Sequence, residues 1–322
     1  MFRIFGPPGT GKTTKLLNLV DKHLEAGVEP TNIAFLAFTR KAAEEARERA
    51  AARFNLDPKQ DLFFFKTLHS LALAMTDIRT DQVMQPEHYR ELGKSIGVNL
   101  GAAADNRFSD IPETQKSSDP ILGLINLAIL RKVPLRTQYN ISQIDESWNV
   151  VKYVDEALTK YKKSYTLYDF TDMLRVFAET GQSCCPRFAV TFLDEAQDLS
   201  PLQWDIAHML DRQSERMYCA GDDDQAIYRW AGADVDQFIG LEGGSETLSQ
   251  SYRVPQLPWE IAQNVARRIH RRFPKTYKPR DERGMVRRIS MVNELDMSEG
   301  SWLILAQAAY LLQDVSSDLK AM

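Results

Sequence analysis

Eight residues near the amino terminus, GPPGTGKT, have the types and spacing that bind the phosphates of a nucleoside triphosphate. Gly6, Gly9 and Gly11 let the backbone wrap so that its N–H groups point inward at phosphate oxygens. Lys12 brings a positive charge to the β- and γ-phosphates, and the Thr13 hydroxyl is placed to ligate Mg²⁺. The alternative, a Gly/Pro turn that matches by chance, is weaker because an apolar strand pattern precedes the loop and a helical pattern follows it.

A second group of candidate residues is the string FLDEAQD at 192–198, which ends an apolar run. Asp194 stands where a phosphate-loop enzyme needs its Mg²⁺-associated carboxylate. Glu195 can take a proton from an attacking water or orient that water. The alternative is an acidic first turn for the helix expected near Pro201, and for Asp198 we weigh the two readings equally.

The third group is the string GDDDQAIYRWAG at 221–232, directly after another strand-like run. Ligands of open parallel sheets bind beyond the carboxyl ends of the strands, so Gln225 can reach a γ-phosphate or its attacking water. Tyr228 and Trp230 can act as platforms for unpaired bases. Taken alone, these two aromatic residues are more simply explained as core anchors with a polar tip.

The elements that must position these groups alternate along the chain. Apolar runs typical of strands lie at 2–5, 33–38, 62–66, 188–193 and 216–220. Helical patterns lie at 12–26, 40–53, 68–75, 169–180 and 201–211. This order predicts an α/β fold with a parallel sheet that helices cover on both faces.

Two regions depart from this order. Residues 76–165 are mostly helical in pattern and read as an insertion, with a polar loop at 103–120. The Gly-rich piece at 240–246 suits a hinge. After it, strand candidates near 246–250, 285–292 and 302–306 predict only part of a second domain.

The composition of the 322 residues, with 43% hydrophobic and 26% charged side chains, is ordinary for a globular protein. No apolar run is long enough to span a membrane. The three cysteines have no metal-binding spacing and suit reduced thiols in a cytosol. We therefore predict a cytoplasmic protein with no membrane span.

Seven sequence blocks, in order, resemble the superfamily 1 DNA helicases of the UvrD/Rep/PcrA-like group. They are GPPGTGKT (6–13), AFTRKAAEEARERA (37–50), TLHSLA (67–72), YDFTDML (168–174), FLDEAQD (192–198), GDDDQAIYRWAGA (221–233) and SQSYR (249–253). The resemblance implies a RecA-like P-loop NTPase domain at 1–75 and 166–243, a helical insertion at 76–165, and the start of a second RecA-like domain at 244–322. It also implies ATP and Mg²⁺ as cofactors, and nucleoid association as the alternative to a cytoplasmic location.

By resemblance, Glu195 is the catalytic base, Asp194 and Thr13 hold Mg²⁺, and Gln225 senses the γ-phosphate. Arg253 matches an arginine that reaches the γ-phosphate from the second domain, and Tyr252 matches a residue that stacks on adenine. A surface ion pair is the alternative for Arg253. The residues assigned to the triphosphate are Gly6, Pro7, Pro8, Gly9, Thr10, Gly11, Lys12, Thr13, Thr14 and Tyr252.

For a single-stranded DNA track, the matching positions are Phe38, Thr39, His69, Tyr228 and Trp230. Thr39 is also expected to cap the helix that begins at Arg40. A histidine such as His69 at a helix start is as often a structural hydrogen-bonding group as a ligand.

A basic segment at 267–288 carries ten lysines and arginines against two acidic residues, in a chain of net charge −4. It could bind phosphates, or it could be a solvated face, and we weigh the two equally.

Three functions are compatible with these patterns. The first is an ATP-dependent translocase or helicase on single-stranded DNA or DNA with single-stranded tails, moving 3′ to 5′ by resemblance and acting alongside other replication or repair proteins. The second is a nucleotide-gated DNA-binding module with little turnover, because the second domain is incomplete. The third is a small-molecule kinase, which the tract at 225–230 argues against.

Overall fold

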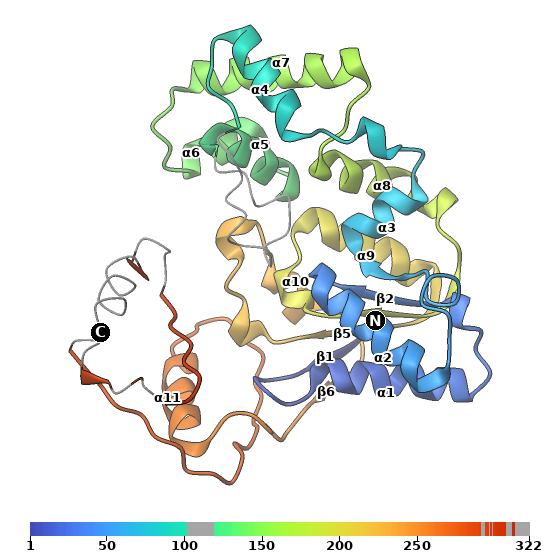
Figure 1. Cartoon of the computed structure of the whole chain (residues 1–322), viewed down its shortest axis with the longest axis vertical. Coiled ribbons are helices and arrows are strands. Elements are labelled where there is room, and N and C mark those ends of the chain that lie inside the picture. The colour runs from blue at the N-terminus through green and yellow to red at the C-terminus, as the bar shows by residue number, and fades with distance from the viewer. Residues whose placement is uncertain (102–118, 291–293, 296, 298, 307–310, 313–322) are drawn as a thin grey trace.

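The fold is built on one sheet of six parallel strands in the order β3-β2-β4-β5-β1-β6 (Figure 1). The computed structural model describes residues 1–101, 119–290, 294–295, 297, 299–306 and 311–312. The strands are β1 (Phe2–Phe5), β2 (Ile33–Ala37), β3 (Phe65–Thr67), β4 (Phe188–Leu193), β5 (Ser214–Gly221) and β6 (Ser245–Thr247). The predicted α/β class with a parallel sheet is confirmed.

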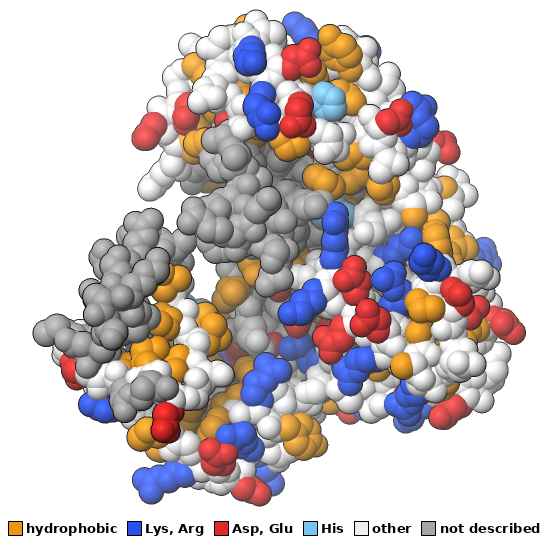
Figure 2. Space-filling model, viewed as in Figure 1, with side chains coloured by type: hydrophobic (Ala, Val, Ile, Leu, Met, Phe, Trp, Pro, Cys, Tyr) orange, Lys and Arg blue, Asp and Glu red, His pale blue; other side chains and the backbone are white. Residues whose placement is uncertain are grey.

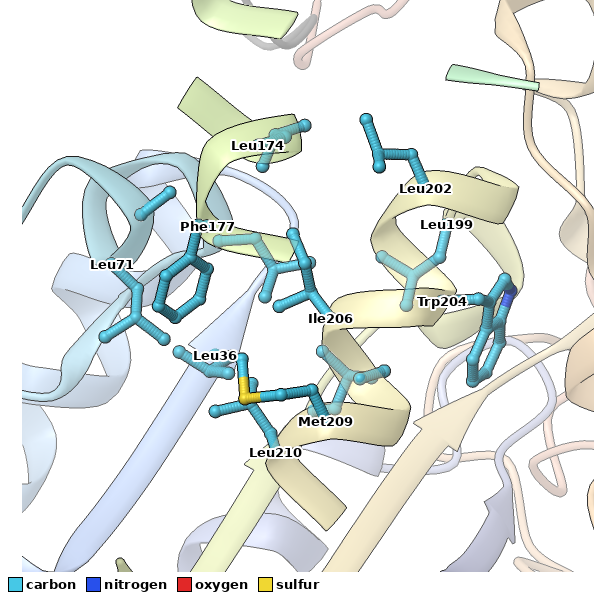
Figure 3. Packing of buried hydrophobic residues seen from close by; sticks show 14 of the residues in the cluster. Leu36, Leu71, Leu174, Phe177, Leu199, Leu202, Trp204, Ile206, Met209 and Leu210 are labelled. Atoms are coloured by element: carbon cyan, nitrogen blue, oxygen red, sulfur yellow. The ribbon is translucent and has the colours of Figure 1, made fainter. Parts of the chain in front are cut away.

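Helices cover both faces of this sheet, because side chains along each strand alternate between two apolar cores. In β2, Ile33 and Phe35 join one core, while Ala34 and Leu36 join the other. The helices of the first face are α1 (Lys12–Glu25) and α2 (Arg40–Phe54). Those of the second face are α3 (Leu68–Met75), α8 (Phe170–Cys184) and α9 (Pro201–Arg212), whose packing Figure 3 shows.

The region predicted as a helical insertion is helical and has an apolar core of its own. Its helices are α4 (Pro86–Ile96), α5 (Pro120–Leu130), α6 (Leu135–Ile141) and α7 (Trp148–Tyr165). The segment that leads into this helical region and the segment that follows it are joined by a short parallel bridge between Val83 and Tyr168. Most of the loop expected at 103–120 lies outside the described residues.

The chain after β5 contains α10 (Val235–Gly240), β6 and α11 (Gln256–Ala266). The strand expected near 246–250 is β6, but it pairs with β1 and so extends the first sheet. The strands expected near 285–292 and 302–306 are wrong: the described residues of both ranges form no strand. In the described part of the chain beyond Thr247, α11 is the longest helix.

The start of β3 differs more from its prediction than the bounds of β2 and β5 do. The run at 62–66 was expected to be extended, but β3 begins only at Phe65. The preceding residues form turns in which the Asp57 carboxylate accepts from the amides of Lys59 and Gln60, both at 2.8 Å. These local hydrogen bonds compete with a strand ladder. No helix among the described residues is long and apolar enough to cross a bilayer.

Candidate functional site

The phosphate-loop string forms a tight turn between β1 and α1. The Gly6 amide donates to the Gly221 carbonyl at 3.0 Å, which joins the loop to the end of β5. Gly9 and Gly11 have φ of 71° and 81°, a left-handed conformation that glycine adopts without strain. A Cβ at Gly6 would lie 1.9 Å from Cγ of Lys12. The glycines are therefore required by the backbone path and by the close approach of the lysine.

Lys12 and Thr13, the first residues of α1, face the carboxylates that follow β4. Nζ of Lys12 donates to the Gly6 carbonyl at 3.1 Å and lies 3.8 Å from Oε2 of Glu195. Oγ1 of Thr13 donates to Oδ2 of Asp194 at 2.9 Å. The fold thus brings together two strings that are far apart in the sequence.

The other assigned loop residues divide into two groups. Thr10 is buried and its hydroxyl donates to the Pro7 carbonyl at 2.7 Å, which stabilises the turn. Pro8 offers its carbonyl to the Ser251 hydroxyl, also at 2.7 Å. Thr14, by contrast, is exposed.

Asp194 and Asp198 beside the loop are buried, and the partly exposed Glu195 lies close enough to repel both. Burial and then the Glu195 charge raise the pKa of Asp194 to about 6, against the Thr13 hydrogen bond and Lys12. The same two causes, burial and Glu195, raise the pKa of Asp198 to about 7. Such a site gains from an added cation, because a cation favours the ionised carboxylates.

These residues fit the way in which Mg²⁺ binds with a nucleotide. Mg²⁺ is usually held by one or two carboxylates together with waters and substrate phosphates. Asp194 and the Thr13 hydroxyl, 2.9 Å apart, offer that minimal protein set. Within the described residues, no cluster of three or more His, Cys, Asp or Glu side chains could hold a metal ion by itself.

Gln197 links the string after β4 to the string after β5. Its Nε2 donates to Oε2 of Glu195 at 2.9 Å and to Oδ2 of Asp198 at 3.0 Å. Its Oε1 accepts from the Asp222 amide at 3.0 Å. Oδ2 of Asp222 in turn accepts from Nε2 of Gln225 at 2.6 Å. Glu195 and Gln225 are therefore connected through two buried side chains.

Gln197 and Asp222 are functional residues that sequence reasoning missed, although they lie in the strings at 192–198 and 221–232. The signal available was the run of three aspartates at 222–224 beside Gln225, since adjacent buried carboxylates need a counter-charge. Which residue supplies it could not be found from spacing, because the partner lies beyond α11.

The segment SQSYR lies directly on the phosphate loop. The Tyr252 amide donates to the Gly9 carbonyl at 2.9 Å. A Cβ at Gly9 would lie 2.4 Å from Cβ of Arg253, so the two backbones are in close contact. The side chains of Tyr252 and Arg253 are exposed beside the loop. The structure thus brings both residues to the loop.

Three of the residues assigned to a DNA track form one aromatic group. The Phe38 and Tyr228 rings lie 5.7 Å apart, and the Tyr228 and Trp230 rings lie 6.4 Å apart. Trp230 is 62% exposed, so it is not a core anchor. Phe38 follows β2 and the other two follow β5, so this aromatic group lies at the carboxyl end of the sheet.

The remaining two residues of the predicted track have clear local surroundings. Oγ1 of Thr39 accepts from the Ala42 amide at 3.2 Å, so its expected role as the helix cap of α2 is confirmed. The His69 ring packs edge-on against Phe170 at 6.3 Å. Its Nε2 is buried without a hydrogen-bond partner among the described residues. Burial and then the charge of Arg40 lower the His69 pKa to about 4.

A parallel sheet whose first strand enters a glycine-rich loop and helix, with Asp194 from another strand beside the lysine and threonine, defines a P-loop nucleotide-binding protein. The family model of the UvrD/REP helicase N-terminal domain matches residues 2–243. The chain belongs to this family, as the resemblance in its motifs implied.

Several curated proteins are similar over most of the chain. The ATP-dependent DNA helicase PcrA of Leuconostoc citreum is 27% identical over 290 residues, covering 84% of this chain and 38% of that protein. The putative ATP-dependent DNA helicase YjcD of Bacillus subtilis is 27% identical over 282 residues, covering 83% and 36%. The ATP-dependent DNA helicase Rep of Buchnera aphidicola is 26% identical over 253 residues, covering 74% and 38%. The chain thus spans well under half the length of these relatives.

Proposed function

We propose that this chain is the ATP-binding part of a DNA motor that couples ATP hydrolysis to movement along single-stranded DNA. In this proposal the loop residues and Lys12 hold the triphosphate, and Thr13 and Asp194 hold Mg²⁺. Glu195 receives the proton of the attacking water, and Arg253 offers positive charge to the γ-phosphate. Bound Mg²⁺ supplies charge neutralisation at the transferred phosphoryl group.

The observation that carries the proposal is the hydrogen-bonded path from Glu195 through Gln197 and Asp222 to Gln225. Gln225 lies only a few residues before the exposed Trp230 in the same loop. A change at the phosphates therefore has a short route, through the buried Gln197 and Asp222, to an aromatic surface. That is the arrangement a motor needs if cleavage is to alter its grip on a polymer.

Single-stranded DNA is the substrate that the aromatic group favours. Bases stack on exposed aromatic rings without sequence preference, each stack contributing about 1–3 kcal/mol. Phe38, Tyr228 and Trp230 offer adjacent rings, and the relatives are named as DNA helicases. We assign the 3′-to-5′ direction by the same resemblance.

A second candidate is a nucleotide-gated DNA-binding module with little turnover. It is favoured by one observation: the described residues beyond Thr247 contain no strand and so no second sheet to close over the nucleotide. In that case nucleotide binding alters the affinity for DNA, while hydrolysis is slow.

ATPase assays with and without oligo-dT separate these functions. A motor hydrolyses ATP, is stimulated by the oligonucleotide, and loses both activities in Lys12→Ala and in Glu195→Gln. General-base removal costs about 10²- to 10⁴-fold. DNA binding without turnover in the wild-type chain supports the module. If the chain does not bind oligo-dT and the oligonucleotide does not change its ATPase activity, both the motor and the binding module are refuted.

The direction of movement has its own assay. Oligonucleotides carrying biotin and streptavidin at either the 3′ or the 5′ end are incubated with protein and ATP. Movement from 3′ to 5′ displaces streptavidin from the 5′ end, while faster displacement from the 3′ end overturns the assigned direction.

A further inference from the structure

The three aspartates after β5 surround a single lysine from a distant part of the chain. Nζ of Lys275 lies 3.1 Å from Oδ1 of Asp222, 2.5 Å from Oδ1 of Asp223 and 2.9 Å from Oδ2 of Asp224. The lysine side chain is 1% exposed, and those of the first two aspartates are fully buried. Burial lowers the pKa of Lys275, but the three carboxylates outweigh it and raise the pKa, so the ammonium stays charged.

Neighbours of Lys275 dock on the same aspartates. Arg272 makes two hydrogen bonds to the Asp224 carboxylate, at 2.9 and 2.6 Å. The Phe273 amide donates to Oδ2 of Asp223 at 2.7 Å. The Phe273 ring stacks on that of Phe5 with centroids 3.8 Å apart and planes 4° apart. Residues 272–275 therefore form one docked unit, which we call the basic plug.

The basic plug revises the sequence-based interpretation of the segment at 267–288. That segment was expected either to bind phosphates or to form a solvated face. Instead, Arg272 and Lys275 compensate buried aspartates inside the molecule, while Arg267 and Arg268 are exposed. Two of the charges are thus engaged internally and are not free for a polynucleotide.

Asp222 connects the basic plug to the candidate active site. One of its carboxylate oxygens faces Lys275, and the other accepts a hydrogen bond from the side-chain amide of Gln225 at 2.6 Å. Its backbone amide donates to Gln197, which donates to Glu195. Without the ammonium, three adjacent carboxylates would repel one another, so the Asp222 carboxylate would rotate away from its neighbours. That rotation alters the acceptor that holds the Gln225 side chain.

We propose that Lys275 is a positioning residue for ATP hydrolysis: it fixes Asp222, which aims the side-chain amide of Gln225. This inference rests on the proposed function. It also makes the chain beyond the matched family region part of the hydrolytic machinery, because the lysine reaches the site from after α11. Release of the basic plug would uncouple Gln225 from the site.

A double-mutant cycle tests the proposal. Lys275→Met lowers kcat about 100-fold with an unchanged Kd for ATP, since small misplacements of catalytic groups cost that much. Lys275→Arg, which keeps the charge, restores part of kcat. In a Gln225→Ala background, Lys275→Met has almost no further effect, because both act through one group. Arg268→Met, which removes an exposed charge of the same segment, leaves basal turnover unchanged.

The outcomes that overturn it are distinct from failure of the motor function. Equal turnover in the wild type and Lys275→Met, or fully additive losses in the cycle, refute positioning. If the wild type itself does not hydrolyse ATP, the proposed function fails. Amide hydrogen exchange then tests separately whether Lys275 holds the loop that carries Gln225. The backbone N–H of Gln225 donates to the backbone carbonyl of Asp222 at 2.9 Å, so its exchange reports on this turn. Faster exchange across 222–228 in Lys275→Met but not in Arg268→Met supports the basic plug, and equal exchange refutes it.

Folding of the variants is checked by circular dichroism and thermal melting before any assay. If Lys275→Met does not fold, Lys275→Gln, which retains a hydrogen-bond donor, replaces it in the same cycle. Arg272→Met is a graded comparison, because its partner Asp224 does not accept from Gln225. We expect a smaller kcat loss for Arg272→Met, and an equal loss would contradict the specific role of Lys275.

Discussion

The sheet and its covering helices are held by apolar burial, whereas the chain after β6 is held mainly by polar contacts. Within the described residues beyond Thr247, the buried hydrophobic side chains are Ala266 and Tyr277. Large apolar side chains there are instead exposed, including Val265 at 60% and Trp302 at 50%. Figure 2 shows orange side chains gathered where Figure 1 places α11.

The contacts that join the two regions are short and few. Ser251 and Tyr252 bond to carbonyls of the phosphate loop, and the basic plug bonds to the aspartates after β5. Close-packed apolar cores resist small displacements, whereas a segment with little buried apolar surface opens locally at a lower cost in free energy. The sheet region therefore acts as a rigid platform, and the later segment is the adjustable partner.

The largest expected effect tests whether the adjustable region supplies chemistry to the platform. Arg253→Ala should lower kcat about 10³-fold or more, because an arginine that compensates charge at a transferred phosphoryl group contributes 10³–10⁵ in rate. ATP binding, measured with a fluorescent analogue, should change little. Arg268→Ala is the control, and equal kcat values for the two variants would make Arg253 a surface residue only.

The next effect compares packing in the two regions. Phe177→Ala removes a fully buried ring from the core and should lower the free energy of unfolding by about 3–5 kcal/mol. Val265→Ala, at a side chain that is 60% exposed, should change it by less than about 0.5 kcal/mol. Urea denaturation measures both, and similar losses would remove the contrast between the regions.

A smaller effect is expected at the aromatic surface of the platform. Trp230→Ala should weaken oligo-dT binding about 5- to 150-fold, the equivalent of one stacked base. Basal ATP hydrolysis should stay nearly constant. Trp302→Ala, in the other region, exposes a similar ring and should leave the affinity unchanged. Fluorescence anisotropy with a labelled oligonucleotide decides, and an unaltered Kd for Trp230→Ala would exclude it from the track.

The smallest effect concerns the pH dependence of the platform. The His69 pKa is lowered to about 4, below its ordinary value of 6.5, so folding favours the neutral ring. Its contribution to stability is complete above pH 6.5 and is lost as the pH falls toward 4. Asp194 and Asp198 have raised pKa values, so their protonation increases the free energy of unfolding as the pH falls over part of this range.

Comparison of variants isolates the histidine. His69→Asn should flatten the decrease in melting temperature between pH 6.5 and 4, while His270→Asn, at an exposed position, should keep the wild-type slope. Parallel slopes for wild type and His69→Asn would mean that His69 takes up its proton without strain. The buried, unpartnered Nε2 in the described structure argues against that result.

Local patterns predicted most of the platform. The runs at 2–5 and 188–193 are strands with those bounds, and the pattern at 68–75 is a helix with those bounds. These assignments depend on neighbouring residues, which the sequence displays directly. Predictions after the hinge were poorer, because β6 joined the first sheet and the two later strand candidates stayed unpaired in the described residues. A strand needs a partner, and no local pattern states which partner is in reach.

The sequence by itself determined the chemistry of the phosphate loop and the family, because glycine, lysine, threonine and acidic residues at fixed spacing leave few other uses. Only the tertiary structure decided that Trp230 is exposed, that Gln197 bridges Glu195 and Asp222, and that Lys275 compensates three clustered aspartates. Burial and ion pairing between distant segments depend on which segments the fold brings into contact. Composition and local spacing do not show which segments those are.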